Sequence, residues 1–221
     1  MLKNFLKIKK IERFNNKIFG KNKNNSQKIL LCEVSNNKIT QVAFSYLVNK
    51  FIERENCKCF GYLDITKINF VGKIKIYIHK ILNFNFGNFL IFKSFNVQSF
   101  LLIRENKVTQ KKTLDFINSI KLKNKYDLVN LKIDNILIGD LIYDTYLKDS
   151  GFPTINLNDQ EFRNFVIKSI NIFYYWQNFF AHNLVVGVII SDTVYTDAMV
   201  ARISSSYKIP TYQCNWNNIC K

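Results

Sequence analysis

The sequence has little proline and glycine, only 2 and 7 residues of 221, and no segment rich in proline, glycine or serine. Flexible linkers between domains have such compositions, so their absence favours one domain. No apolar run reaches the roughly 18 to 20 residues that a membrane-spanning helix needs, and the N-terminus lacks the features of a secretory signal. We therefore expect a soluble protein in the cytoplasm.

Signatures of nucleotide and ester chemistry are also missing. The chain has no glycine-rich phosphate loop of the G-x-G-x-x-G or G-x-x-x-x-G-K-[ST] type and no nucleophile elbow, which disfavours nucleotide hydrolysis and serine esterase chemistry. The five cysteines are odd in number, and Cys57 and Cys59 stand too close for the usual C-x-x-C metal spacing. We expect reduced cysteines and no structural metal.

Acidic residues are scarce: 16 Asp and Glu stand against 32 Lys and Arg, for a net charge of +16. A basic surface attracts polyanions such as nucleic acid or an anionic membrane. The competing explanation is compositional, because abundant Lys, Asn, Ile and Phe with scarce Gly, Pro and Ala are expected of an AT-rich coding sequence. We attribute more than half of the charge to this bias.

Half of the excess charge lies in residues 1–28, where nine basic residues accompany the single acid Glu12. Apolar residues recur among them at nearly helical spacing, which predicts an amphipathic basic helix able to lie on an acidic membrane surface. A solvated, partly disordered arm is the alternative. We treat residues 1–28 as an N-terminal arm and residues 29–221 as one domain.

The remaining pattern predicts an α/β fold. Residues 28–34 and 59–63 are short apolar runs typical of buried strands, and residues 38–55 between them have one apolar helical stripe. This β-α-β order makes the two strands parallel. Residues 70–92 and 105–123 are expected to be helical, and 97–103 to form a third strand.

The last third of the chain repeats this order. Asn158 is expected to cap a long aromatic helix, and the unbroken apolar run 184–190 is typical of a central parallel strand. A helix rich in small residues and a final strand, 211–214, follow. The whole predicts a Rossmann-like open parallel sheet flanked by helices.

Polar residues directly follow the predicted central strand, where ligands of open parallel sheets bind. Asp192 is a candidate general base for a hydroxyl acceptor or an anchor for substrate hydroxyls, with Tyr195 as a neighbouring donor. The alternative is that Ser191, Asp192 or Thr193 caps the next helix.

A second constellation lies at residues 138–147. Asp140 and Asp144 would share one face of a helix, flanked by Tyr143 and Tyr146. Paired carboxylates can split acid and base roles, but the absence of a third ligand at useful spacing argues against a metal. Gly139 would allow a tight turn or a close approach of another element. His79 and His182 have no partner that the sequence assigns.

The segment Ile138 to Leu147, the aromatic helix after it, and the segment Val188 to Tyr195 with its small-residue helix occur in this order. Together they resemble the N-terminal half of bacterial capsule and surface-polysaccharide biosynthesis proteins, glycosyltransferases of the two-domain GT-B type. The resemblance covers residues 133–213. It implies a transfer of sugar from a nucleotide sugar to a glycan or lipid-linked acceptor. The basic, amphipathic N-terminus suits a protein that works on lipid-linked acceptors at the inner face of a membrane.

The resemblance further implies that residues 29–221 are the acceptor-side domain, without the C-terminal sugar-nucleotide domain. A partner domain or subunit would then bind the nucleotide sugar, so we expect no cofactor on this chain. The family's strand often ends in Ser-His-Thr, and Asp192 in place of the histidine is either a substitute catalytic base or a sign of lost activity. The residues that the resemblance places at the substrate are Asp140, Tyr143, Asp144, Ser191, Asp192, Thr193 and Tyr195.

Two other functions compete with a transferase. One is a non-catalytic binding subunit of a polysaccharide assembly complex. The other is a basic nucleic-acid-binding module, which is disfavoured because the aromatic residues fall on apolar helix faces, as core residues do.

Overall fold

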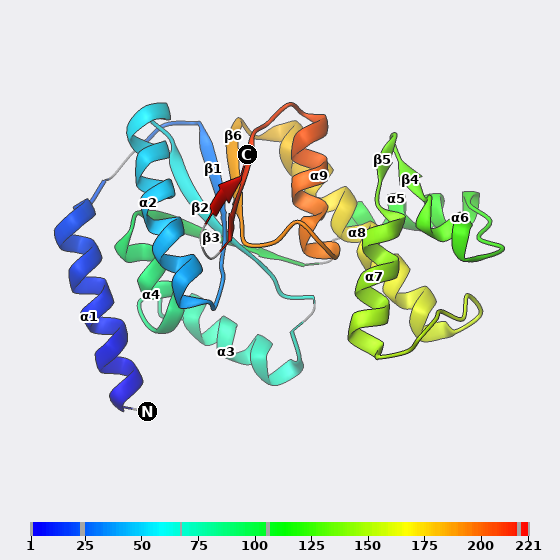
Figure 1. The fold of residues 1–221 in the computed structure, drawn as a ribbon, viewed down its shortest axis with the longest axis horizontal. Coiled ribbons are helices and arrows are strands. Elements are labelled where there is room, and N and C mark those ends of the chain that lie inside the picture. The colour runs from blue at the N-terminus through cyan, green and yellow to red at the C-terminus, as the bar shows by residue number, and fades with distance from the viewer. Residues whose placement is uncertain (1, 23–24, 67, 105–106, 216–217, 221) are drawn as a thin grey trace. The chain divides into compact units, whose positions relative to one another are not determined.

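A computed structural model describes residues 2–22, 25–66, 68–104, 107–215 and 218–220 (Figure 1). The chain groups into two compact units, each described by itself below. Unit 1 comprises residues 1–103, 183–191 and 210–221, and unit 2 comprises residues 104–182 and 192–209.

Unit 1 contains the predicted sheet. Five strands are parallel, in the order β3-β2-β1-β6-β7, and β8 pairs with β7 in the antiparallel sense. This confirms the Rossmann-like α/β class. The strands are β1 (Ile29–Glu33), β2 (Lys58–Asp64), β3 (Val97–Ile103), β6 (Val185–Ile190), β7 (Thr211–Asn215) and β8 (Asn218–Cys220).

Helix α2 (Lys38–Glu55) crosses over from β1 to β2 and packs on β1, β6 and β7. It begins where the Asn37 side chain accepts hydrogen bonds from the Ile39 and Thr40 amides, and it ends at Asn56 in the left-handed conformation. The apolar stripe expected from Ile39, Val42 and Tyr46 is wrong, because those three residues are exposed. The face that packs on the sheet is the neighbouring one, which includes Phe44, Val48 and Phe51. The predicted β-α-β unit is therefore present.

Residues 70–92, predicted as one helix, form two: α3 (Phe70–Ile81) and α4 (Gly87–Ser94), of which α4 packs on β3. The single-helix prediction is wrong because the backbone turns between them, where Asn83 and Phe84 adopt positive φ angles. Asparagine tolerates this conformation better than most residues.

The amphipathic helix predicted near the N-terminus is α1 (Leu2–Phe19), and it packs against α4. Ile8, Ile11 and Phe19 lie against the hydrophobic core of unit 1. The Asn15 side chain donates to Ser94 Oγ at 2.9 Å, in a buried hydrogen bond between the two helices. Much of the apolar face of α1 is thus used inside the protein.

The described part of unit 2 is mainly helical and includes a short antiparallel pair, β4 with β5. Its longest helix, α8, has the aromatic buried face that the sequence predicts, including Phe162, Phe173 and Trp176. The cap is one residue later than predicted: Asp159 Oδ1, not Asn158, accepts from the Glu161 amide at 3.0 Å. The elements are α5 (Lys107–Ser119), α6 (Lys125–Val129), β4 (Lys132–Ile133), β5 (Ile136–Leu137), α7 (Gly139–Ser150), α8 (Gln160–His182), the 3₁₀-helix η1 (Thr196–Ala198) and α9 (Met199–Ser206).

Gly139, the first residue of α7, meets its neighbours too closely to carry a side chain. A Cβ atom there would overlap the Leu128 carbonyl oxygen and would lie 2.8 Å from the Leu131 nitrogen. We expect Gly139→Ala to lower the free energy of unfolding by about 3 kcal/mol, because backbone rather than a flexible side chain must move. Gly151→Asn, at an open left-handed position in the same unit, should cost less than about 1 kcal/mol. Equal urea midpoints for the two variants would contradict this reading.

Four cysteines are buried and Cys220 is exposed. Burial raises the pKa of Cys57 to about 12 and that of Cys214 to about 11, and it raises the pKa of Cys32 well above its usual value. These thiols are therefore protonated and poorly nucleophilic at pH 8. We expect a disulfide reagent to modify one thiol rapidly in the native protein and all five in guanidinium chloride. Rapid native modification of more than one would show that the core opens readily.

Candidate functional site at the carboxyl edge of the sheet

The strand order of unit 1 reverses between β1 and β6. From β1 the chain proceeds to β2 and β3 on one side, whereas β6 is followed by β7 on the other. At such a switch point the two connections leave the sheet in opposite directions, and ligands of open α/β sheets bind in the resulting crevice beyond the carboxyl ends of the strands. The residues that end β1 and follow β6 are therefore the first candidates for a site.

Those residues are Glu33 and Ser191, and they are bonded to each other. The Ser191 amide donates to Glu33 Oε2 at 2.6 Å, and the Ser191 hydroxyl lies 2.8 Å from each carboxylate oxygen. Both residues are half-buried. Hydrogen bonds to an ionised carboxylate are the stronger kind, so the pair holds a negative group in a defined position at the switch point.

The loop from β1 to α2 continues this polar edge. The Gln41 side chain, 3% exposed, donates to the Ser35 carbonyl at 2.8 Å. Lys38 Nζ donates to Gln41 Oε1 at 3.3 Å and to Asn88 Oδ1, at the start of α4, at 2.9 Å. Burial lowers the pKa of Lys38 below its usual value. A connected set of side chains thus joins the end of β1 to the N-termini of α2 and α4.

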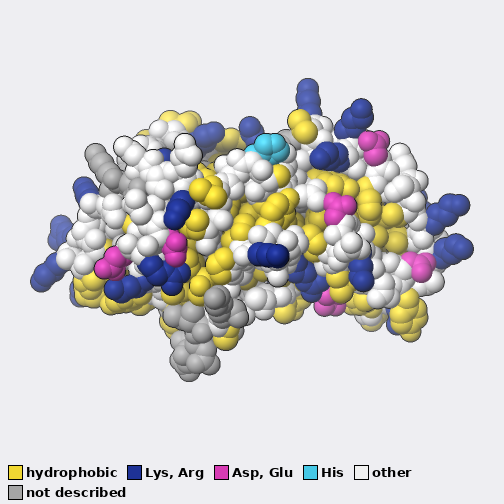
Figure 2. Space-filling view, turned by 90° about the horizontal axis from the view of Figure 1, so that it is seen from above, with side chains coloured by type: hydrophobic (Ala, Val, Ile, Leu, Met, Phe, Trp, Pro, Cys, Tyr) yellow, Lys and Arg dark blue, Asp and Glu magenta, His cyan; other side chains and the backbone are white. Residues whose placement is uncertain are grey.

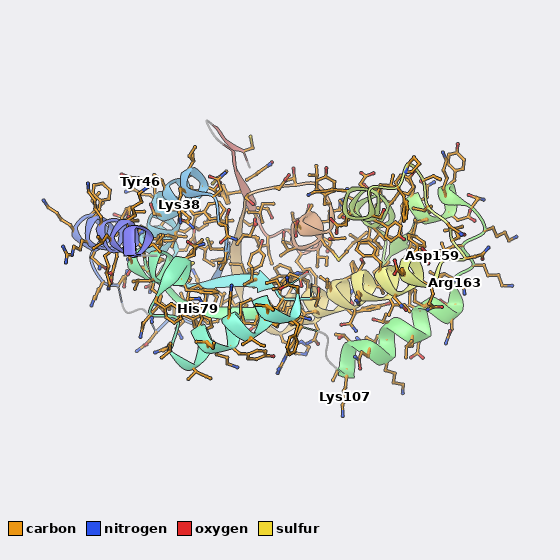
Figure 3. The ribbon with its side chains drawn as sticks, turned by 90° about the horizontal axis from the view of Figure 1, so that it is seen from below. Lys38, Tyr46, His79, Lys107, Asp159 and Arg163 are labelled. Atoms are coloured by element: carbon orange, nitrogen blue, oxygen red, sulfur yellow. The ribbon has the colours of Figure 1, made fainter. Side chains whose placement is uncertain are left out.

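A mainly apolar hollow of 270 Å³ adjoins Lys38 and Gln41. It lies among α1, α2 and α4, and Figure 3 labels Lys38 and Tyr46 from its lining. Phe14, Val42 and Tyr46, which line it, are all at least half exposed. The hollow therefore offers apolar contact next to the polar edge.

The carboxylate that follows β2 serves its own loop. Asp64 Oδ1 accepts from the Thr66 amide at 2.8 Å and from the Thr66 hydroxyl at 2.6 Å. This is the local side-chain bonding that stabilises a turn after a strand. Asp64 therefore has a structural role in its turn, and Glu33 is the stronger candidate for binding a ligand.

Of the predicted site residues, Ser191 lies in this edge. Asp192, Thr193 and Tyr195 follow it in the chain and are grouped with unit 2. Asp192 is exposed, and its Oδ1 accepts from the Val194 amide at 3.3 Å. The capping alternative is wrong, since η1 begins after Tyr195 without any side-chain cap. The assignment of Asp192, Thr193 and Tyr195 to a substrate stays a prediction.

Tyr195 has two unusual features. Its backbone φ is 60°, which is uncommon for a residue with a side chain. Lys148 Nζ, on α7, lies 3.9 Å from the centre of the Tyr195 ring, within the range of a cation–π interaction. Tyr195 therefore has a structural partner inside unit 2.

The two carboxylates of α7 have different surroundings. Asp140 makes a two-pronged ion pair with Arg202 of α9, and Arg202 also donates to the Leu137 carbonyl at 2.7 Å. Asp144 is exposed and Tyr143 is half-buried. Asp140 is thus engaged in joining α7, α9 and the end of β5, so the two carboxylates are not equivalent.

The histidines also have local partners. The His79 ring stacks on Phe86 with centroids 3.8 Å apart, and burial lowers its pKa. His182 Nδ1 lies 2.8 Å from the Asn178 carbonyl, one turn earlier in α8. Neither arrangement joins a histidine to Glu33 or Ser191.

Glu33 was not among the residues that the sequence singled out. It belongs to the run 28–34, which was interpreted only as a buried strand. The usable signal was an acidic residue at the carboxyl end of an otherwise apolar strand, since that end is where ligands bind. The strand that pairs with β1 on its other side lies more than 150 residues away, and local patterns do not reveal it.

Among the described residues, no group of three or more His, Cys, Asp and Glu side chains is arranged to hold a metal ion. In the same part of the chain, no helix has the length and apolar character needed to cross a membrane. No family model, curated protein or solved structure matches the chain.

The contrast between the α7 carboxylates can be measured. We expect Asp140→Asn to lower the free energy of unfolding by about 1 to 2 kcal/mol, because Arg202 loses a two-pronged partner that is only about 30% exposed. Asp144→Asn, on the same helix, should change it by less than about 0.5 kcal/mol. Urea unfolding of both variants tests this, and an equal effect would remove the structural role of Asp140.

Proposed function

We propose that the protein binds a hydroxyl-bearing acceptor at the carboxyl edge of β1 and β6, as the acceptor side of a glycosyltransferase of surface or capsular polysaccharide biosynthesis. The observation that carries the proposal is the Glu33 carboxylate, held by Ser191 at the switch point of the sheet. The family itself rests on the resemblance of residues 133–213. We place the activity in the cytoplasm.

The chemistry of sugar transfer suits a carboxylate at this place. The acceptor hydroxyl attacks the anomeric carbon of the donor sugar, the bond from that carbon to the nucleotide phosphate breaks, and a base removes the hydroxyl proton. Glu33 can accept a hydrogen bond from the acceptor hydroxyl and receive this proton. Asp192, next to Ser191 in the chain, is the base that the resemblance favours.

The hollow beside Lys38 supports an acceptor with an apolar part. It adjoins Gln41, which is bonded to the Ser35 carbonyl two residues after Glu33. A lipid-linked acceptor has hydroxyl groups for the edge and an acyl or prenyl portion for such a hollow. The chain has no phosphate-binding glycine motif, so we assign the nucleotide sugar to a partner domain or subunit.

One observation favours a second candidate, a binding subunit without transfer activity. Both Glu33 oxygens already accept hydrogen bonds from Ser191, which is an arrangement suited to holding a ligand at least as much as to moving a proton. A nucleic-acid module is less well supported. On the face seen in Figure 2, Lys and Arg side chains are spread widely and not gathered into one patch.

Binding can be tested with defined probes by saturation-transfer NMR on the full chain, using methyl glycosides of hexoses, N-acetylhexosamines and uronic acids, and a short-chain prenyl phosphate sugar. We expect at least one glycoside to bind, and Glu33→Gln to weaken it about tenfold, since a hydrogen bond to a charged group is lost. Glu53→Gln on α2 is the matched control, because Glu53 is exposed and pairs with Lys50 in the same helix. Binding that survives Glu33→Gln excludes this edge.

A second variant separates transfer from binding. Asp192 is exposed, so Asp192→Ala should leave the urea midpoint unchanged. With a nucleotide-sugar-binding partner present, we expect it to abolish transfer or acceptor binding. Unaltered transfer removes Asp192 from the mechanism, and glycoside binding without any transfer favours the non-catalytic subunit.

A further inference from the structure

Helix α3 exposes an unusually apolar face. Phe70 at its start and Ile81 at its end are 76% and 81% exposed. Single exposed apolar residues are common, but a contiguous apolar surface usually marks an interaction site. We call this surface the α3 stripe; it comprises Phe70, Val71, Ile74, Tyr77, Ile78 and Ile81, with Leu82 at the C-cap.

The stripe is not a misplaced core surface, because the opposite side of α3 is the side that packs. Ile76 is buried, and His79 stacks on Phe86 and lies with its ring centre 5.0 Å from that of Phe89. The helix also has a defined start, where Asn69 Oδ1 accepts from the Gly72 amide at 2.9 Å. Figure 3 views unit 1 from the side on which α3 lies and labels His79.

Lysines border the stripe on both sides. At 3.6 residues per turn, Lys73 and Lys80 fall along one edge of the stripe and Lys75 along the other. The sequence contains no Asp or Glu between Ile65 and Arg104. An apolar face with lysines along its borders is the arrangement of helices that lie in a membrane interface, because long lysine side chains reach the headgroups while the apolar face enters the acyl boundary.

We propose that α3 docks unit 1 onto a bilayer surface containing anionic lipids, with the stripe among the acyl chains and the three lysines at the phosphates. This proposal does not rest on sugar transfer. The sequence pattern alone favours residues 1–28 as the membrane-binding segment. We assign that contact to α3 instead, because Ile8, Ile11 and Phe19 of α1 pack against the core.

Charge and apolar character together favour an anionic bilayer over a second copy of the chain or a nucleic acid as the partner of α3. Two copies of the chain docked through α3 would bring six lysines together with no acidic residue of this region to pair them. A nucleic acid would use the lysines but would leave the isoleucines in water. Anionic lipid satisfies both the lysines and the apolar stripe.

The test is co-sedimentation of the full chain with phosphatidylcholine vesicles, with and without phosphatidylglycerol. We expect binding that needs phosphatidylglycerol. Ile78→Ser with Ile81→Ser should lower the partition coefficient about tenfold or more, since two exposed apolar side chains no longer enter the bilayer. The triple variant in which Lys73, Lys75 and Lys80 are each replaced by Gln should lower the partition coefficient about fivefold per lysine. It should also remove most of the dependence on anionic lipid.

Two matched controls assign the effect to α3. The double variant Leu6→Ser with Ile18→Ser removes exposed apolar residues from α1. The triple variant in which Lys107, Lys111 and Lys112 are each replaced by Gln removes three charges from α5. Both should bind vesicles nearly as the wild type does. All altered residues except Lys73 are exposed, so circular dichroism and urea midpoints should be unchanged and should exclude misfolding as the cause.

A positional readout completes the design. Tryptophan introduced as Phe70→Trp should shift its emission to the blue on vesicles and be quenched by brominated acyl chains, whereas Val108→Trp on α5 should do neither. Loss of binding in the α1 variant with retention in the α3 variants overturns the proposal. So does a wild-type self-association that the α3 variants abolish without vesicle binding, or polynucleotide binding that needs the lysines but not Ile78 and Ile81.

Discussion

Unit 1 depends on the parallel pairing of β1 with β6. Leu30 lies beside Gly187, and Cys32 beside Ile189, so segments more than 150 residues apart form the centre of one sheet. Leu30, Leu31 and Cys32 have no exposed surface, which is the burial expected of a strand covered on both faces. Gly187 allows this packing, since a Cβ there would lie 3.0 Å from the Phe51 ring. Without this pair, β2 and β3 would be separated from β7.

The candidate site is a consequence of the same pairing. Glu33 ends β1 and Ser191 follows β6, so the register that aligns the strands also brings the carboxylate to the serine. Neither residue alone would identify a site. Their meeting at the switch point makes them the candidate, because the connections diverge there and ligands of open α/β sheets bind beyond such strand ends. The pairing of β1 with β6 therefore both holds the sheet together and forms the Glu33–Ser191 pair.

This explains what the sequence could and could not predict. The positions of β1, β2, β3, β6 and β7 and the span of α2 followed from apolar runs and periodicity. The buried face of α2 did not, since Ile39, Val42 and Tyr46 are exposed. The order of the strands did not follow, because an apolar run does not specify its neighbour. The same limit hid Glu33. The cap of α8 was placed on Asn158, one residue before Asp159, for a different and local reason: both are good capping residues.

The periodicity of the sequence also does not predict what an apolar helix face contacts. Residues 2–19 and 70–81 both form basic helices with an apolar side, yet α1 packs against α4 while the stripe of α3 remains exposed. The two helices differ in which side packs against the rest of unit 1. His79 and Ile76 anchor α3 from the side opposite its stripe, whereas α1 contacts the core with its apolar side. An exposed apolar face costs solubility in water, and that cost is offset only when another apolar phase covers the face.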